Sequence, residues 1–168
     1  MAIVKFTIAW RKDLNNLIIK IDKDLELKGV LMKTVQELLR GEKSAIESID
    51  AVLQKINDNS ERDQLSSIRQ DHVNAVNTLT RYATNEEYKA GKDSGPWGAF
   101  TIAFAGGASF FGDKAALQAL KVGEQHGLNE YKELIANNAI DQDLKMRVVN
   151  ELIPQQERHL NQINKYLQ

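Results

Sequence analysis

One glutamate inside an otherwise apolar helical stripe is the feature that most restricts how this chain can fold. Between Leu117 and Ile135, apolar residues recur at the three- and four-residue spacing of a helix that buries one face. Glu124 falls on that stripe, where a leucine is expected. Because a buried carboxylate needs a partner of opposite charge or a metal ion, the stripe predicts a polar site inside a helical core.

Four segments of the chain share this pattern, each with one polar residue on its apolar stripe. They are 31–56 with Glu42, 61–84 with His72, 114–136 with Glu124 and 142–167 with His159. Four amphipathic helices of this length bury their stripes by packing together as a bundle. The chain has only 2 Pro and many strong helix formers. We therefore expect an all-α four-helix bundle over residues 30–168.

Local signals set the expected ends of these helices. Ser60 is the expected N-cap of the second helix, with an acidic residue three positions on completing a capping box. Asp113 and Asp141 are the expected N-caps of the third and fourth helices. Pro154 lies inside the fourth helix and has no N–H to donate, so we expect a kink just before His159.

Residues 1–29 are expected to form an extension outside the bundle. Residues 4–10 alternate like a strand but have no evident partner strand, whereas apolar residues from Trp10 onward recur like a helix. We favour an amphipathic helix over residues 8–28 that ends near Gly29. Its apolar face would pack on the bundle or form a homodimer contact. A polar face that mixes Lys with Asp argues against binding to a membrane.

Residues 85–112 are long for a connection and are expected to cross the length of the bundle. Aromatic residues separated by small ones run from Trp97 to Phe111 and would pack on the outside of the bundle. This aromatic surface is a second candidate contact for a homodimer. Gly106 and Gly107 lack the spacing and the Lys-Ser/Thr of a phosphate-binding loop.

Composition narrows the functional classes. The chain holds 22 basic and 23 acidic residues, so it lacks the basic excess of a nucleic-acid-binding surface. It has no cysteine, which removes disulfides and thiolate metal sites and fits a reducing cytoplasm. Its longest apolar stretch, 97–111, is shorter than the ~20 residues that span a bilayer. The N-terminus lacks the order of a signal peptide. We expect a cytoplasmic protein with no membrane segment.

The two predicted hairpins look like copies of one unit. Each holds a Gly-Glu pair and, later, a His followed by an apolar residue and two asparagines, at 41–42 and 72–77 in the first copy and at 123–124 and 159–164 in the second. Two hairpins joined by a long crossover resemble the ferritin-like superfamily. The Gly-Asp, Gly-Glu and Tyr-Lys-Glu-Leu motifs of 112–134 are similar to an uncharacterised bacterial family within it, a domain of unknown function. The resemblance covers residues 31–167 and implies a ferritin-like four-helix bundle.

The resemblance also implies where a site would lie. Ferritin-like di-iron proteins take one Glu from each of two helices and a Glu-x-x-His motif from each of the other two. Glu42 and Glu124 match the single glutamates, and His72 and His159 match the histidines. Carboxylates and imidazoles of this kind suit iron, manganese or zinc.

The glutamate of each Glu-x-x-His motif is replaced, by Arg69 in the first copy and by Gln156 in the second. Two carboxylates balance two iron ions poorly, and a cationic Arg69 near the site would oppose a second metal. A di-iron oxidase or peroxidase is therefore the least favoured hypothesis, and we name no catalytic residue. His126, two positions from Glu124, is expected on the surface, and so are four acidic residues of the first and third helices: Glu47, Asp50, Glu130 and Glu133.

Three interpretations of the site remain open. In the first, Glu42, His72, Glu124 and His159 bind one divalent metal ion, with water completing the coordination. In the second, no metal binds, and Arg69 pairs with one of the glutamates in a buried hydrogen-bonded network. In the third, one or more of these side chains point outward and the pattern is fortuitous. The corresponding functions are a metal-binding ferritin-like protein, with a role in stress physiology implied by the resemblance, and a structural or protein-interaction bundle.

Overall fold

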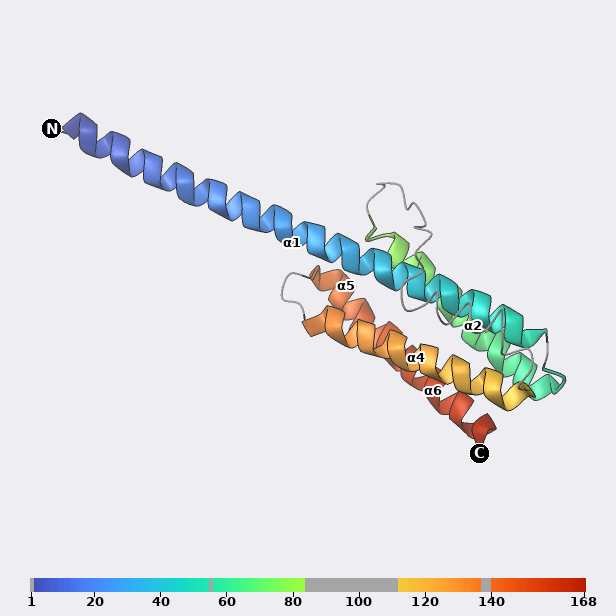
Figure 1. The fold of residues 1–168 in the computed structure, drawn as a ribbon. Helices are drawn as coiled ribbons and strands as arrows, with labels where there is room; N and C mark the ends of the chain where they lie inside the picture. Colours follow the sequence, from blue (N-terminus) through green and yellow to red (C-terminus); the bar gives the residue numbers. More distant parts are fainter. Residues whose placement is uncertain (1, 55, 84–111, 137–139) are drawn as a thin grey trace.

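The computed structural model describes residues 2–54, 56–83, 112–136 and 140–168, with the backbone alone for residues 2–14, 112 and 113. Every regular element among these is helical: α1 (Ala2–Leu53), α2 (Asn59–Thr80), α4 (Gly112–Ala136), α5 (Gln142–Arg147), the π-helical turn η2 (Val148–Leu152) and α6 (Ile153–Leu167). Helix α1 packs against α2 and α4, and α4 packs against α6 (Figure 1). The all-α class is confirmed. The expected crossover and its aromatic residues, 85–111, lie outside the described residues.

Helix α1 is a single helix of 52 residues. The expected separate N-terminal helix that ends near Gly29 is therefore wrong, because α1 runs through Gly29 without a break. Glycine in a helix interior costs about 1 kcal/mol relative to alanine, which is too little to end a helix this long. The N-terminal half of α1 extends well beyond the other helices (Figure 1). Across the part of the chain that is described, no helix has the length and apolar character needed to cross a membrane.

Two apolar clusters form the core, and they lie at opposite ends of the bundle. The first combines residues 35–39 of α1 with the C-terminal parts of α2 and α4 and with α5 and η2. The second combines residues 49–56 with the N-terminal parts of α2 and α4 and with the C-terminal part of α6. On all four long helices the predicted polar residue lies between the two clusters. Burial of the apolar side chains on both sides thus places the four polar ones at one level of the core.

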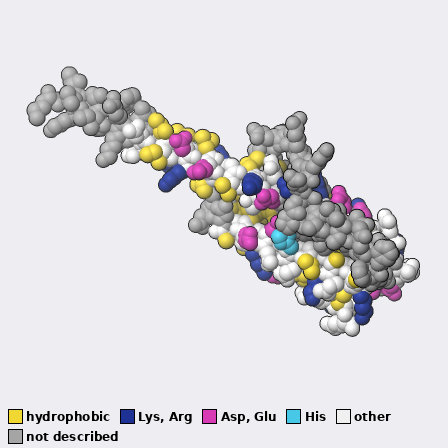
Figure 2. Space-filling model, viewed as in Figure 1, with side chains coloured by type: hydrophobic (Ala, Val, Ile, Leu, Met, Phe, Trp, Pro, Cys, Tyr) yellow, Lys and Arg dark blue, Asp and Glu magenta, His cyan; other side chains and the backbone are white. Residues whose placement is uncertain are grey.

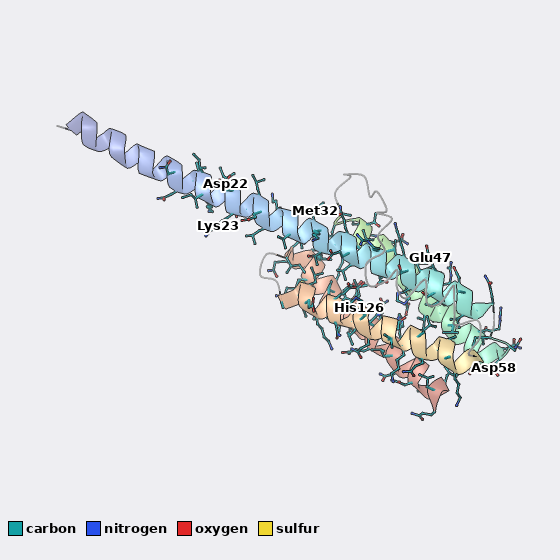
Figure 3. All side chains as sticks on the ribbon, in the orientation of Figure 1. Asp22, Lys23, Met32, Glu47, Asp58 and His126 are labelled. Carbon is teal, nitrogen blue, oxygen red and sulfur yellow. The ribbon has the colours of Figure 1, made fainter. Side chains whose placement is uncertain are left out.

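The helix ends agree only partly with the local signals. Asp58, at the far end of the bundle in Figure 3, is the N-cap of α2, and its side chain accepts a hydrogen bond from the N–H of Glu61. The expected cap Ser60 lies inside the first turn. Asp141 caps α5 as expected and accepts from the N–H groups two and three residues on. Helix α4 already includes Asp113, so this residue is not the N-cap.

The fourth predicted helix contains a π-helical turn where a kink was expected. The N–H of Ile153 donates to the carbonyl of Val148, five residues back, instead of four. Pro154 follows at the start of α6, directly after this wider turn. The wider turn accommodates the proline, and α6 continues beyond it with Gln156 and His159 on its buried face.

Candidate metal centre

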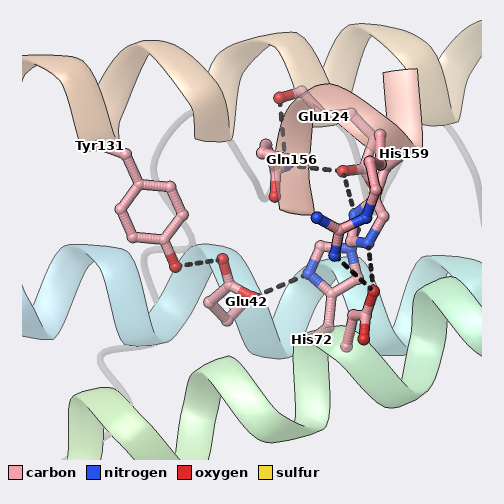
Figure 4. Close-up of polar contacts among 8 residues, drawn as sticks. Glu42, His72, Glu124, Tyr131, Gln156 and His159 are labelled. Carbon is pink, nitrogen blue, oxygen red and sulfur yellow. Dashed lines mark hydrogen bonds and ion pairs between the residues drawn. The ribbon is translucent and has the colours of Figure 1, made fainter. Parts of the chain in front are cut away.

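Four side chains from four helices converge between the apolar clusters (Figure 4). They are the four predicted from the sequence: Glu42 of α1, His72 of α2, Glu124 of α4 and His159 of α6. All are at least 95% buried, and the two imidazole rings lie 5.0 Å apart between centroids. The structure therefore gives no support to the interpretation in which these side chains face solvent.

His72 lies between two carboxylates. Its Nδ1 is 2.7 Å from Oε2 of Glu42, and its Nε2 is 2.9 Å from Oε1 of Glu124. A neutral imidazole has one N–H, so donation to both sides requires the charged ring. Burial alone would lower the pKa of His72, but the charges of Glu124 and Glu42 and their hydrogen bonds raise it well above its usual value. Without a metal, His72 is thus the buried cation of this centre.

Glu124 is the most heavily bonded residue of the centre. Besides His72, its carboxylate contacts Nδ1 of His159 at 3.2 Å and accepts a hydrogen bond of 2.6 Å from Nε2 of Gln156. Burial alone would raise the pKa of this carboxyl, but the charge of His72 and the hydrogen bonds of both histidines lower it to about 2. Glu124 is therefore ionised throughout the neutral pH range.

Two residues that the sequence did not single out complete the network. The hydroxyl of Tyr131 donates to Oε1 of Glu42 at 2.7 Å, and Oδ2 of Asp71 lies 3.1 Å from Nε2 of His159. Burial, followed by the charge of Glu42, raises the pKa of Tyr131 well above its usual value. Tyr131 was assigned to the apolar stripe, and its spacing of seven residues from Glu124 was the available sign that it shares the same face. Nothing in the spacing marked Asp71.

Arg69 does not take part in the centre. Its guanidinium forms two hydrogen bonds with Asp50 of α1, at 2.5 and 2.9 Å, and both side chains are more than a third exposed. The expected pairing of Arg69 with Glu42 or Glu124 is wrong, and so is the expected repulsion of a metal by this cation. A carboxylate on the neighbouring helix holds Arg69 on the outside of the bundle.

Gln156, at the equivalent position of the second copy, points inward. Its Nε2 also donates to the backbone carbonyl of Glu124 at 3.1 Å. Gly127 leaves room for this inward position, because a Cβ there would lie 3.0 Å from Nε2 of Gln156, a tight contact. The first copy has Ala45 three residues after its glutamate instead of a glycine. The two copies thus differ at two pairs of equivalent positions, Arg69 with Gln156 and Ala45 with Gly127. Of Arg69 and Gln156, only Gln156 points inward.

Among the other predicted surface residues, Glu130 is an exception, because its side chain is 24% exposed and lines the small cavity beside His72 and Glu124. The ring of His126 is 42% exposed and is 3.4 Å from Oε1 of Glu130, one turn along α4 (Figure 3). Glu47 and Glu133 are exposed. His126 is therefore no part of the polar centre, as expected.

Three residues of the centre could hold a metal ion. His72, Glu124 and His159 each offer one ligand atom, and these atoms all lie within 4.8 Å of one another. Comparison of the chain with protein-family models, with curated proteins and with solved structures finds no match. The geometry of the centre is therefore the basis for a functional argument.

Proposed function

We propose that the protein binds one divalent transition-metal ion through Nε2 of His72, Nδ1 of His159 and the carboxylate of Glu124. The observation that carries the proposal is the separation of these atoms: the two ring nitrogens are 2.9 and 3.2 Å from the Glu124 oxygens. Ligands at about 2.0 Å from a tetrahedral ion lie about 3.3 Å apart. An ion that replaces the protons between these atoms would draw the three ligand atoms, which lie within 4.8 Å of one another, towards this spacing, and its binding would release protons.

The carboxylates beyond the histidines support this assignment. A histidine that binds a metal through one nitrogen usually donates its other N–H to a carboxylate, which sets the orientation of the ring. Glu42 accepts from the second nitrogen of His72, and Asp71 faces the second nitrogen of His159. Glu42 lies across the His72 ring from Glu124, so we assign it this orienting role in place of direct coordination.

A small cavity beside His72 and Glu124 provides space for a water ligand. It is lined by small residues of α1 and α4, including Gly41, Gly123 and Gly127, and its volume is about 10 Å³. That is about the space one water molecule requires. Two histidines, one carboxylate and a water suit Zn(II), Fe(II) or Mn(II).

The wider proposal is a ferritin-like metal-binding protein that holds one ion. The similar hairpins and the inward Glu and His residues support the ferritin-like assignment. Gln156 stands where a di-iron centre has a second carboxylate, which argues against a second metal and against di-iron oxidation. A stress-related role remains part of the proposal through the sequence resemblance alone.

A metal-free structural network is the second candidate. The observation in its favour is that both ring nitrogens of His72 and of His159 already face carboxylates. With His72 charged, its two buried glutamate partners have the cation that they need. In this case the centre would specify how the four helices pack and would have no affinity for metal.

Metal content and stability distinguish the two candidates. Protein purified without added metal is analysed for iron, manganese and zinc, then stripped with a chelator and titrated with each ion. A bound ion predicts one equivalent per chain, abolished in Glu124→Gln and in His159→Ala and retained in the surface variant His126→Ala. An ion at about 100 times its Kd adds about 2.7 kcal/mol, so the Tm should rise with metal and fall with chelator. Uptake of much less than one equivalent of each ion, with a Tm that the chelator does not change, would show the network to be metal-free.

A further inference from the structure

The N-terminal half of α1 carries an apolar surface that nothing in the described structure covers. Seven large apolar side chains between residues 15 and 30 are 46% to 62% exposed, and they lie along the helix that projects from the bundle (Figure 2). A helix without tertiary contacts has little stability in water, and contiguous exposed apolar surface marks interaction sites.

The stripe on this projecting half is continuous with the one that packs the bundle. Alternating steps of three and four residues connect its apolar positions, which are Ile18, Ile21, Leu25, Met32, Val35, Leu39, Ile46, Ile49 and Leu53, with Lys28 and Glu42 as the polar members. Beyond residue 32 this stripe enters the core, where Val35 and Ile49 are at most 1% exposed. A repeat that averages 3.5 residues is the spacing of a coiled coil. The projecting half therefore presents the same packing surface as the bundle, without its partner helices.

We propose that this stripe pairs with the same stripe of a second copy of the chain, in antiparallel orientation. Residues 15–30 hold three Lys and three acidic residues, so they offer no net charge for an oppositely charged partner or an anionic lipid surface. A second copy supplies an apolar stripe of the same length and spacing. The resulting contact has two-fold symmetry, as most homodimer interfaces do.

The antiparallel orientation follows from charge and from space. Parallel pairing in register would place Lys28 against Lys28 of the second copy. Antiparallel pairing offsets the two lysines along the helices and lets each reach acidic residues beside the other stripe. Helices α2 and α4 cover the stripe beyond residue 32, so a parallel pair would also crowd both bundles at one end. An antiparallel pair of the 18–32 stripes shares about 22 Å of helix, from 15 residues at 1.5 Å each, and puts the two bundles at opposite ends.

Light scattering after size exclusion tests the pairing, in chelator so that the result does not depend on the metal centre. The mass measured for the wild-type protein should be twice the 18.9 kDa of one chain. The double variant Ile21→Glu/Leu25→Glu should elute at 18.9 kDa and keep its urea midpoint, since the bundle is untouched. Ile19→Glu/Leu27→Glu changes apolar residues off the stripe and should stay dimeric. A monomeric wild type, or a dimer that survives the stripe variant, overturns the proposal.

Distance measurement tests the orientation. The chain has no cysteine, so Val30→Cys gives a single labelling site, and Val30 is 52% exposed and off the stripe. In an antiparallel dimer residue 30 faces residue 20 of the second copy, so spin labels at residue 30 should be offset by about 15 Å along the helix axis. Labels with no such offset would establish a parallel dimer. Wild-type chain that sediments with phosphatidylglycerol vesicles, when Ile21→Glu/Leu25→Glu does not, would identify a membrane as the occupant and overturn the second-copy assignment.

Discussion

Replacing Glu124 with glutamine should remove a stabilising charge from the core. The change keeps the size of the side chain but leaves three groups, on His72, His159 and Gln156, facing an amide. The pKa of Glu124 is about 2 in the fold, against 4.5 for the free group. At 1.36 kcal/mol per pKa unit, this difference stabilises the folded state by about 3 kcal/mol at neutral pH. A typical domain has 5–15 kcal/mol in all, so the effect should be large.

Urea denaturation of the metal-free protein measures this loss. We expect Glu124→Gln to lower the midpoint strongly with little change in the slope, which reports the surface exposed on unfolding. Glu157→Gln is the matched control, because Glu157 is about half exposed and lies 3.7 Å from Lys132. An exposed pair of this kind contributes less than about 1 kcal/mol. If the two variants lose similar amounts, the buried network does not stabilise the fold as reasoned.

The pH dependence of the same charge provides an internal check. Because folding lowers the pKa of Glu124, its contribution is complete above pH 4.5 and is lost as the pH falls towards 2. Between those limits, the free energies of unfolding of the wild type and Glu124→Gln should converge. A constant difference across this range would refute the assignment of the effect to the charge.

Three further predictions concern single contacts. Asp58→Ala should lower the free energy of unfolding by about 1 kcal/mol and Ser60→Ala by much less, as thermal denaturation would show; the reverse order would restore Ser60 as the cap. Tyr131→Phe should lower the free energy of unfolding measured in urea by about 1–3 kcal/mol, because Glu42 loses a buried hydrogen-bond donor, while the metal stoichiometry is retained. Loss of metal binding in this variant would show that Tyr131 is needed for the metal site itself. Folding raises the pKa of His72, so the stability that it contributes is complete below about pH 6.5 and lost as the pH rises through the folded value. Thermal denaturation of metal-free protein in alkaline buffers checks this, and a rising Tm would contradict it.

Helical periodicity was enough to locate the four long helices and the polar position on each. The reason is that an amphipathic helix has to bury its stripe, and a polar residue on the stripe goes in with it. The N-terminal helix was wrongly predicted to end near Gly29. The free energy that one glycine costs a helix is smaller than the free energy that the helix gains from the residues on either side of it. The N-cap of α2 was predicted two residues too late because Asp58 and Ser60, two positions apart, are both good cap residues.

The contacts between helices could not be read from the stripe. Asp71 lies off the apolar face of α2, and only the position of α6 brings His159 within 3.1 Å of it. Arg69 and Gln156 occupy equivalent positions in the two copies, yet one points out and the other in. That choice depends on Asp50 and Gly127, which belong to other helices.

The sequence by itself determined an all-helical chain with four polar residues on four buried stripes, because hydrophobic burial and helical period act within each segment. Tertiary structure decided which of those residues contact one another. Glu42 and Glu124 are equivalent in the repeat, but the packing of α2 puts them on opposite edges of the His72 ring. Distances of about 3 Å between side chains on different helices are set by the packing of the whole bundle, and no local pattern records them.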